Sequence, residues 1–337
     1  MTRIPASVDI ATQWGVSRQT ADRAVHELQR LGLVVRQRRW GTVVAPREAV
    51  KRTGRVALLV DQFSQELNFP SGDLIRGIQD VLGENINLLL TESKGDPDME
   101  ARQLLRLPGE VDGLIVYPTS RPKNTPVLKH LIESGMPVVV LDRIPVGVET
   151  DAVVSDNEAA TLRAIRALEE RGHRRIGFFS FHKPEFSSVK ERHAAYQLAL
   201  AEVGIEDATE LTRWFARELE SQPQPFLQSI HDAVFTLLNQ PDPITALFCV
   251  QDSIAVAVLE ACDRIGISVP DDLEIALFND WPPVMLRSPW NLHRIVPRSY
   301  LIGQTAARLL KERIEGAPHP LQTVKVDADF FVANLGK

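Results

Sequence analysis

Apolar positions along the chain follow two different patterns. Over residues 17–31 they recur at the i, i+3, i+4 and i+7 spacing of an amphipathic helix, namely Ala21, Ala24, Val25, Leu28 and Leu31. Ser17 is a favourable N-terminal cap for this helix. A supporting helix is expected over 8–14, and residues 34–44 predict two short strands around a basic turn.

The polar face of the predicted helix is rich in groups that bind nucleic acid. Its first turn holds Arg18 and Thr20, and the side opposite the apolar stripe holds Gln19, Asp22, Arg23, His26 and Arg30. A short helix, a turn and a second helix with such a face are typical of DNA recognition. The basic turn, with Arg38 and Arg39, would reach phosphates or the adjacent minor groove as a wing.

The rest of the chain alternates short apolar runs with helical segments. The runs begin near positions 55, 86, 113, 137, 175, 246 and 274, and helices are expected at 73–83, 97–107, 124–134, 157–171, 187–203 and 252–265. Near-continuous apolar strands are typical of parallel sheets that are covered by helices on both faces. Because the pattern runs twice, we expect an α/β fold with two doubly wound lobes.

Polar residues follow the predicted strands. The strand ends carry Asp61-Gln62, Tyr117, Asp142-Arg143, Phe181-His182, Gln251-Asp252 and Asn279-Asp280. Because doubly wound folds bind ligands outside the carboxyl ends of their strands, a cleft between two lobes would gather these groups around a small polar molecule. Each of them alone could instead cap a helix or close a turn.

Charge is distributed unevenly over the 337 residues. Up to Arg55 there are 11 Lys and Arg against 4 Asp and Glu, and the remainder has 27 against 40. A basic module on an acidic body suits polyanion binding at one end, although a solvated charged surface would have the same composition. No run approaches a membrane span and the first residues lack a signal sequence, so we expect a cytoplasmic protein.

The sequence offers little for catalysis. It has no G-x-S-x-G, no H-E-x-x-H, no phosphate loop, and no G-x-G-x-x-G after the first predicted strand. Cys249 and Cys262 lie in apolar surroundings without a C-x-x-C or a histidine cluster, so they are expected to be buried thiols. We therefore expect no enzyme, no metal and no cofactor.

The N-terminal stretch resembles the winged helix-turn-helix of GntR-type bacterial regulators. The motifs are Ile4-Pro5, Gly15-Val16-Ser17-Arg18, Glu27-Leu28 with Gly32-Leu33, and Gly41-Thr42-Val43-Val44. The resemblance implies DNA contacts by Ser17, Arg18 and Thr20 and makes Gly41 the wing glycine. With the polar face and the basic turn, the candidate DNA contacts are Ser17, Arg18, Gln19, Thr20, Arg23, Arg38, Arg39 and Gly41.

Three positions depart from that family's pattern, and its first helix is missing. They are Val8, Asp22 and Arg39. Asp22 can accept a hydrogen bond from a cytosine amino group or simply repel phosphate, and Arg23, Arg38 and Arg39 could restore the lost positive charge.

From about Arg55 onward the chain resembles the effector domain of the LacI/GalR family, which is akin to periplasmic sugar-binding proteins. The motifs are V-V-V-L-D-R (138–143), V-S-D-N-E-A-A (154–160), R-G-H-R-R-I-G (171–177), G-I-S-V-P-D-D-L-E-I-A-L-F-N-D (266–280) and G-Q-T-A-A-R-L-L (303–310). We expect a DNA-binding domain over 1–46, a linker over 47–54 and an effector domain over 55–337. Lobe 1 would comprise 55–154 and 291–318, and lobe 2 would comprise 155–290 and 319–337.

The second resemblance implies effector contacts by Asp142, Arg192, Gln251, Asp252, Asn279 and Asp280. A guanidinium can hold two hydroxyls or a carboxylate, so Arg192 is the strongest candidate, with a surface ion pair as the alternative. Asp61 is a further candidate effector contact because it follows a predicted strand. Among Phe69, Phe181, Trp214 and Trp281, which could stack on a sugar or pack in the core, Phe69 and Trp281 have the better placement.

The two resemblances together imply a ligand-responsive transcriptional repressor. We expect a homodimer that binds operator DNA and a small effector, with no membrane partner. The order of the two parts is that of known sugar-responsive repressors, so a pentose or another sugar is the first expectation. Ligand would close the lobes and change the spacing of two DNA modules. The alternatives are a solute-binding protein and a regulator whose DNA module no longer binds operator.

Overall fold

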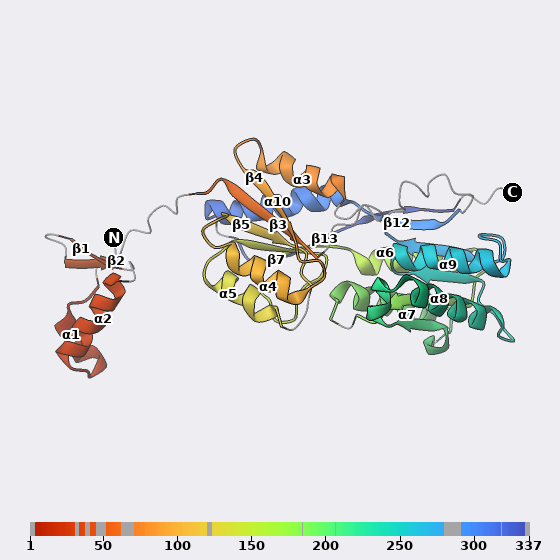
Figure 1. Ribbon diagram of the computed structural model, residues 1–337, viewed down its shortest axis with the longest axis horizontal. Coiled ribbons are helices and arrows are strands. Elements are labelled where there is room, and N and C mark those ends of the chain that lie inside the picture. The colour runs from red at the N-terminus through yellow and green to blue at the C-terminus, as the bar shows by residue number, and fades with distance from the viewer. Residues whose placement is uncertain are drawn as a thin grey trace. The chain divides into compact units, whose positions relative to one another are not determined.

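The computed structural model describes residues 4–30, 34–37, 41–44, 52–61, 71–119, 123–183, 185–205, 207–279, 291–317 and 319–333. The chain divides into two compact units, Met1–Thr53 and Gly54–Lys337. Figure 1 labels most of the helices and several of the strands of both units. None of the helices in these residues is long and apolar enough to cross a membrane.

The first unit is a pair of helices followed by a hairpin. It contains α1 (Ser7–Trp14), α2 (Arg18–Arg30), β1 (Val34–Gln37) and β2 (Gly41–Val44), with β1 and β2 antiparallel. The backbone N–H of Thr20 donates to Ser17 Oγ at 3.1 Å, which confirms Ser17 as the cap of α2. Of the predicted apolar stripe, Ala21 is buried, whereas Ala24 is exposed.

The first lobe of the second unit is built on a six-stranded parallel sheet. Its order is β13-β7-β6-β5-β3-β4. The strands are β3 (Arg55–Val60), β4 (Asn87–Glu92), β5 (Gly113–Val116), β6 (Val138–Leu141), β7 (Asp151–Ser155) and β13 (Thr323–Val326). Helices α3 (Gly72–Leu82) and α10 (Ser299–Glu315) cover one face, and α4 (Pro97–Arg106) and α5 (Thr125–Glu133) cover the other (Figure 1).

The second lobe has a second six-stranded sheet of order β14-β12-β11-β10-β8-β9, parallel except for β14. Its strands are β8 (Ile176–Phe181), β9 (Thr212–Phe215), β10 (Ala246–Cys249), β11 (Glu274–Phe278), β12 (His293–Pro297) and β14 (Ala328–Phe331). Helices α6 (Asn157–Glu170) and α7 (Ser187–Glu202) cover one face, and α8 (Pro223–Leu238) and α9 (Asp252–Ile265) cover the other. The predicted pair of doubly wound α/β lobes is confirmed.

The lobe boundaries differ from the expected ones. The chain crosses between the lobes at Asp156, Arg298 and Asp327. Strand β12, expected in lobe 1, therefore completes the second sheet, and β13, expected in lobe 2, completes the first. The physical reason is that β12 pairs with β11 and β13 pairs with β7, so the sheet to which each strand belongs is set by its hydrogen-bonding partner and not by its place along the chain.

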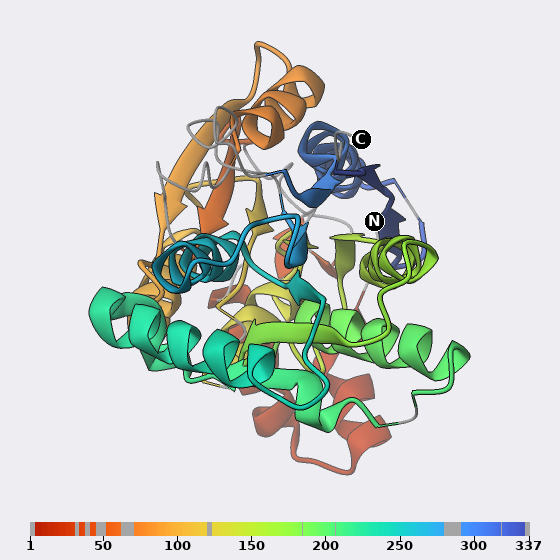
Figure 2. The ribbon, with the colours of Figure 1, turned by 90° about the vertical axis from the view of Figure 1, so that its right-hand side faces the viewer.

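Helices α3 and α10 approach each other closely because two glycines face the contact. A Cβ atom added to Gly77 would lie 2.2 Å from the carbonyl oxygen of Tyr300, and one added to Gly303 would lie 2.3 Å from that of Leu74. Figure 2 shows the blue α10 beside the orange α3. The closeness of this contact depends on the absence of side chains at both positions.

The two cysteines are free thiols, and both are buried as predicted. Burial raises the pKa of Cys249 well above its ordinary value and raises that of Cys262 to about 12. Both are therefore protonated, packed side chains of the second lobe.

Candidate effector site and DNA-contact surface

The predicted ligand residues that the structure describes lie at the carboxyl ends of strands in both lobes. Asp61 follows β3 and Asp142 follows β6 in the first lobe, while Gln251 follows β10 and Asn279 follows β11 in the second. Asp252 begins α9, and Arg192 projects from α7. Three further candidates, Phe69, Asp280 and Trp281, lie outside the described residues.

Arg192 is buried and held from three sides within the second lobe. Its Nε donates to Asn157 Oδ1 at 2.9 Å, and its Nη1 donates to the carbonyl oxygen of Val250 at 3.2 Å. The guanidinium carbon lies 3.5 Å from the centre of the Phe278 ring. Burial lowers the pKa of Arg192 to about 10, with Asp142 and Glu191 opposing, so the group stays cationic at neutral pH.

The remaining nitrogen of this guanidinium faces the other lobe. Arg192 Nη2 lies 3.9 Å from Asp142 Oδ1. Asn157, the second partner of Arg192, also donates from Nδ2 to Glu191 Oε2 at 2.8 Å, which fixes the orientation of the amide. Asp142 and Arg192 thus form an oppositely charged pair across the two lobes, at a separation longer than a direct hydrogen bond.

The loop after β6 carries a second charged group. Arg143 Nη1 lies 3.0 Å from Asp61 Oδ2, and Arg143 Nε lies 3.3 Å from Asp142 Oδ2. Burial lowers the pKa of Arg143, but Asp61 and Asp142 outweigh it and raise the pKa overall. Burial together with the charge of Asp142 raises the pKa of the nearby Tyr117 phenol, so that phenol is neutral.

The same loop contacts the start of α7 in the second lobe. The guanidinium of Arg143 stacks 4.0 Å from the centre of the Phe186 ring, and the backbone N–H of Ile144 donates to Ser187 Oγ at 3.1 Å. The segment that carries Asp142 is therefore tied to the helix that carries Arg192. A change in the separation of the lobes must alter both contacts.

Two other candidates have features that suit a ligand site. Among the described residues, Gln251 Oε1 is buried and has no hydrogen-bond partner. Asp142 and Asn279 have positive φ angles, 63° and 129°, which non-glycine residues rarely adopt. An unsatisfied acceptor and strained backbone at strand ends are typical of functional sites.

Sequence reasoning missed part of this arrangement. Asn157 and Phe278 both hold Arg192, yet in the sequence they stand out only as members of the motifs 154–160 and 266–280. Of the aromatic candidates, Phe181 is fully buried and stacks on Phe226, which places it in the core. Trp214 is 40% exposed and packs beside His182 and His193.

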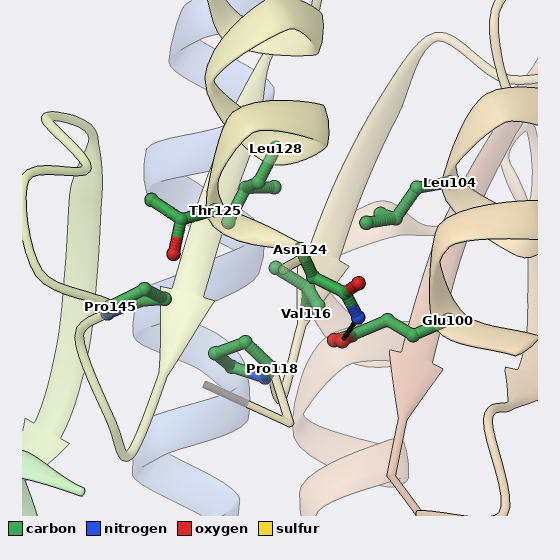
Figure 3. Close-up of a pocket in the computed structure, with 8 residues that line it drawn as sticks. All are labelled: Glu100, Leu104, Val116, Pro118, Asn124, Thr125, Leu128 and Pro145. Carbon is green, nitrogen blue, oxygen red and sulfur yellow. Dashed lines mark hydrogen bonds between the residues drawn. The ribbon is translucent and has the colours of Figure 1, made fainter. Parts of the chain in front are cut away.

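A separate small pocket lies in the first lobe (Figure 3), and it is lined by Glu100, Leu104, Val116, Pro118, Asn124, Thr125, Leu128 and Pro145. It includes none of the predicted ligand residues. Glu100 is buried there and accepts hydrogen bonds from the Thr119 backbone, the Thr119 hydroxyl and the Asn124 amide. With a cavity volume of about 10 Å³, it has room for about one water molecule.

The predicted DNA contacts form an exposed surface at the start of α2. Ser17, Arg18, Gln19, Thr20 and Arg23 are all exposed, and Gly41 begins β2 with a φ of 75°. The Ser17 and Thr20 hydroxyls lie 2.8 Å apart, so both are engaged in the cap. Arg38 and Arg39 lie outside the described residues.

Residues 165–330 match the family model described as "Periplasmic binding protein-like domain". The chain is 28% identical over 289 residues to the arabinose metabolism transcriptional repressor of Geobacillus stearothermophilus, covering 83% of this chain and 76% of that protein. It is 27% identical over 336 residues to catabolite control protein A of Priestia megaterium, covering 93% of this chain and 96% of that protein. Over most of its length, this chain is therefore similar to bacterial proteins named as transcriptional regulators.

A solved structure described as a regulatory protein of LacI family from Chloroflexus aggregans has the same fold as the second unit. The TM-score is 0.71 at 19% identity, over 84% of this chain and 99% of that one. The match to catabolite control protein A is longer than the second unit and therefore extends into the first unit. These relatives support a helix-turn-helix of the LacI type, which corrects the GntR-type assignment made from the motifs.

Proposed function

We propose that this protein is a repressor of the LacI family whose first unit binds operator DNA and whose second unit binds a small sugar or sugar-like effector between its lobes. The similarity to a relative named as an arabinose metabolism transcriptional repressor supports this. The site is proposed to comprise Asp61, Phe69, Asp142, Arg192, Gln251, Asp252, Asn279, Asp280 and Trp281.

The pair formed by Arg192 and Asp142 carries the effector proposal. Their 3.9 Å separation is too long for a direct hydrogen bond and joins the two lobes. A hydroxyl group can donate to a carboxylate and accept from a guanidinium at once, so a polyhydroxylated molecule suits the pair. Gln251 Oε1, which lacks a partner among the described residues, adds an acceptor for a further hydroxyl.

For DNA, the proposed contacts are Ser17, the cap of α2, with Arg18, Gln19, Thr20 and Arg23 on α2, Gly41 at the start of β2, and Arg38 and Arg39, which lie outside the described residues. The exposed basic surface and the antiparallel hairpin support this. A single module of this size binds DNA weakly, so we propose a homodimer that presents two modules to two half-sites.

A thermal-shift screen of sugars and nucleosides tests the effector site. A compound that binds only the folded protein at 100 times its Kd adds about 2.7 kcal/mol of stability, which is a shift of about 5 °C for a domain of this size. The Arg192→Ala variant should lose the shift. The matched control is Arg166→Ala, because Arg166 pairs with Glu202 on the surface of the second lobe and should keep it.

Two outcomes would contradict the proposal. An unchanged shift in Arg192→Ala would remove Arg192 from the site. A set of sugars that gives no shift in the wild-type protein, alongside binding of an unrelated class of compound, would reject the sugar assignment.

A further inference from the structure

A carboxylate lies on the helix that bears the proposed DNA contacts. Asp22 is in the second turn of α2, and its Oδ2 lies 3.8 Å from Nε of Arg18, one helical turn earlier. Both side chains are exposed, at 56% for Asp22 and 74% for Arg18. The first turn of α2 contains no acidic residue. Asp22 therefore brings a negative charge to a surface that is otherwise neutral or basic at this end of the helix.

Neither helix stability nor general DNA affinity accounts for this residue. An exposed pair at i, i+4 contributes little to a helix, and the order with the cation first is the weaker of the two. A carboxylate next to DNA also repels phosphates, which lowers affinity for every sequence. Asp22 therefore lowers the affinity for DNA in general. It is favourable only if it raises the affinity for particular sequences.

The chemistry of the two side chains matches the two bases of one pair. A guanidinium binds guanine O6 and N7 with two N–H groups, and a carboxylate accepts a hydrogen bond from the cytosine amino group. The pairing of Asp22 with Nε of Arg18 leaves both terminal nitrogens of that guanidinium for a base. Four residues of helix rise about 6 Å, so the two side chains span about two base-pair steps.

We infer that Arg18 and Asp22 act as one base-reading pair that selects G·C pairs in the DNA site. The inference rests on the proposed function and names the sequence preference of the same surface. Arg18 binds guanine, and Asp22 accepts from the amino group of a cytosine in the same or an adjacent pair. Because the two opposite charges lie 3.8 Å apart, loss of one changes the electrostatic surroundings of the other, so the two residues depend on each other.

Selection from a pool of random DNA duplexes tests the inference with the full-length protein. The wild-type protein should enrich sequences with fixed G·C pairs. The Asp22→Asn and Asp22→Ala variants should lose about tenfold of the preference for cytosine at one such position and should bind unselected duplex more tightly. In the double variant Arg18→Ala/Asp22→Asn, the losses should be smaller than the product of the single effects.

Glu27→Gln is the charge-matched control. Glu27 is an exposed acid on the same helix, and its change removes the same charge. It should strengthen binding to unselected duplex and leave the enriched sequence unchanged.

The outcomes separate the inference from the function on which it rests. If Asp22→Asn enriches the same sequences as the wild-type protein, Asp22 is only a repulsive charge and the inference is overturned. If the wild-type protein binds no duplex and enriches no sequence, the proposed operator binding fails, and the inference fails with it. Fixed A·T pairs in place of G·C pairs would also overturn the inference.

Discussion

Among individual residues, Glu274 shows how a buried charge stabilises the second lobe. Its carboxylate accepts from Arg171 Nε at 2.8 Å and from His293 Nε2 at 2.9 Å, and lies 3.2 Å from His173 Nε2. Burial raises the pKa of Glu274, but the hydrogen bonds from Arg171, His293 and His173 outweigh it and lower the pKa to about 2. The stabilisation is complete above about pH 4.5 and is lost as the pH falls towards 2.

His293 adds to this acid sensitivity. Its Nδ1 accepts from the Ala333 backbone N–H at 3.3 Å, so the proton of the neutral ring is on Nε2, which donates to Glu274. Burial lowers the pKa of His293, with Glu274 opposing. The folded state therefore favours the neutral ring, and its stability falls as the pH drops below about 6.5.

The prediction concerns the free energy of unfolding between pH 7 and pH 3. Replacing the carboxylate in Glu274→Gln leaves Arg171 and His293 without their charged partner and should cost about 2 kcal/mol at pH 7. The variant should also show a shallower loss of stability on acidification. Urea unfolding at each pH measures both, and Glu202→Gln, at an exposed pair, should change little. If the free energy of unfolding fell with pH in parallel for the wild-type protein and Glu274→Gln, this account would be contradicted.

The sequence could predict which polar groups gather at the site but not what holds them. Asp142 and Arg192 could be placed by motif resemblance, and the structure brings them to 3.9 Å. Asn157 and Phe278 could not be linked to Arg192, because they are distant in sequence and approach it only through the packing of α6, α7 and β11. The spacing of apolar residues and the amino-acid composition contain no information on which side chains will contact each other.

At the scale of secondary-structure elements, the contact between α3 and α10 could not be predicted from the sequence. A glycine within a helical pattern predicts only a weaker helix. In the structure, Gly77 and Gly303 face backbone carbonyl groups across the contact. The helices and strands themselves could be predicted from the spacing of their apolar residues. The lobe to which β12 and β13 belong could not, because sheet membership depends on partners far along the chain.

The Gly303→Ala variant tests this packing. Its methyl group would meet the Leu74 carbonyl oxygen at 2.3 Å, so the helices must move apart, at a cost of about 1–3 kcal/mol in stability. Gly72→Ala is the control, because nothing lies within 4 Å of the added carbon at the start of α3. Thermal unfolding should show a lower melting temperature for Gly303→Ala only. Equal melting temperatures for the two variants would show that the contact tolerates a side chain.

At the scale of the whole molecule, the two lobes of the second unit are connected by three crossings of the chain. Arg163 Nη2 pairs with Asp327 Oδ1 at 2.7 Å, and Arg298 Nη2 pairs with Asp329 Oδ1 at 2.6 Å, so charged pairs lie beside two of the crossings. Asp142 and Arg192 face each other across the lobes. We propose that an effector between them shifts the lobe arrangement and thereby changes how two DNA modules fit their half-sites.

Calorimetric titration of an effector found in the thermal-shift screen, with and without a duplex from the selection, tests this coupling most directly. Linkage requires that DNA changes effector affinity by the same factor by which effector changes DNA affinity, and such factors are typically about 5 to 150. We predict a matching change of at least about fivefold in both directions. Equal effector affinities with and without the duplex would contradict the proposed communication between the two units.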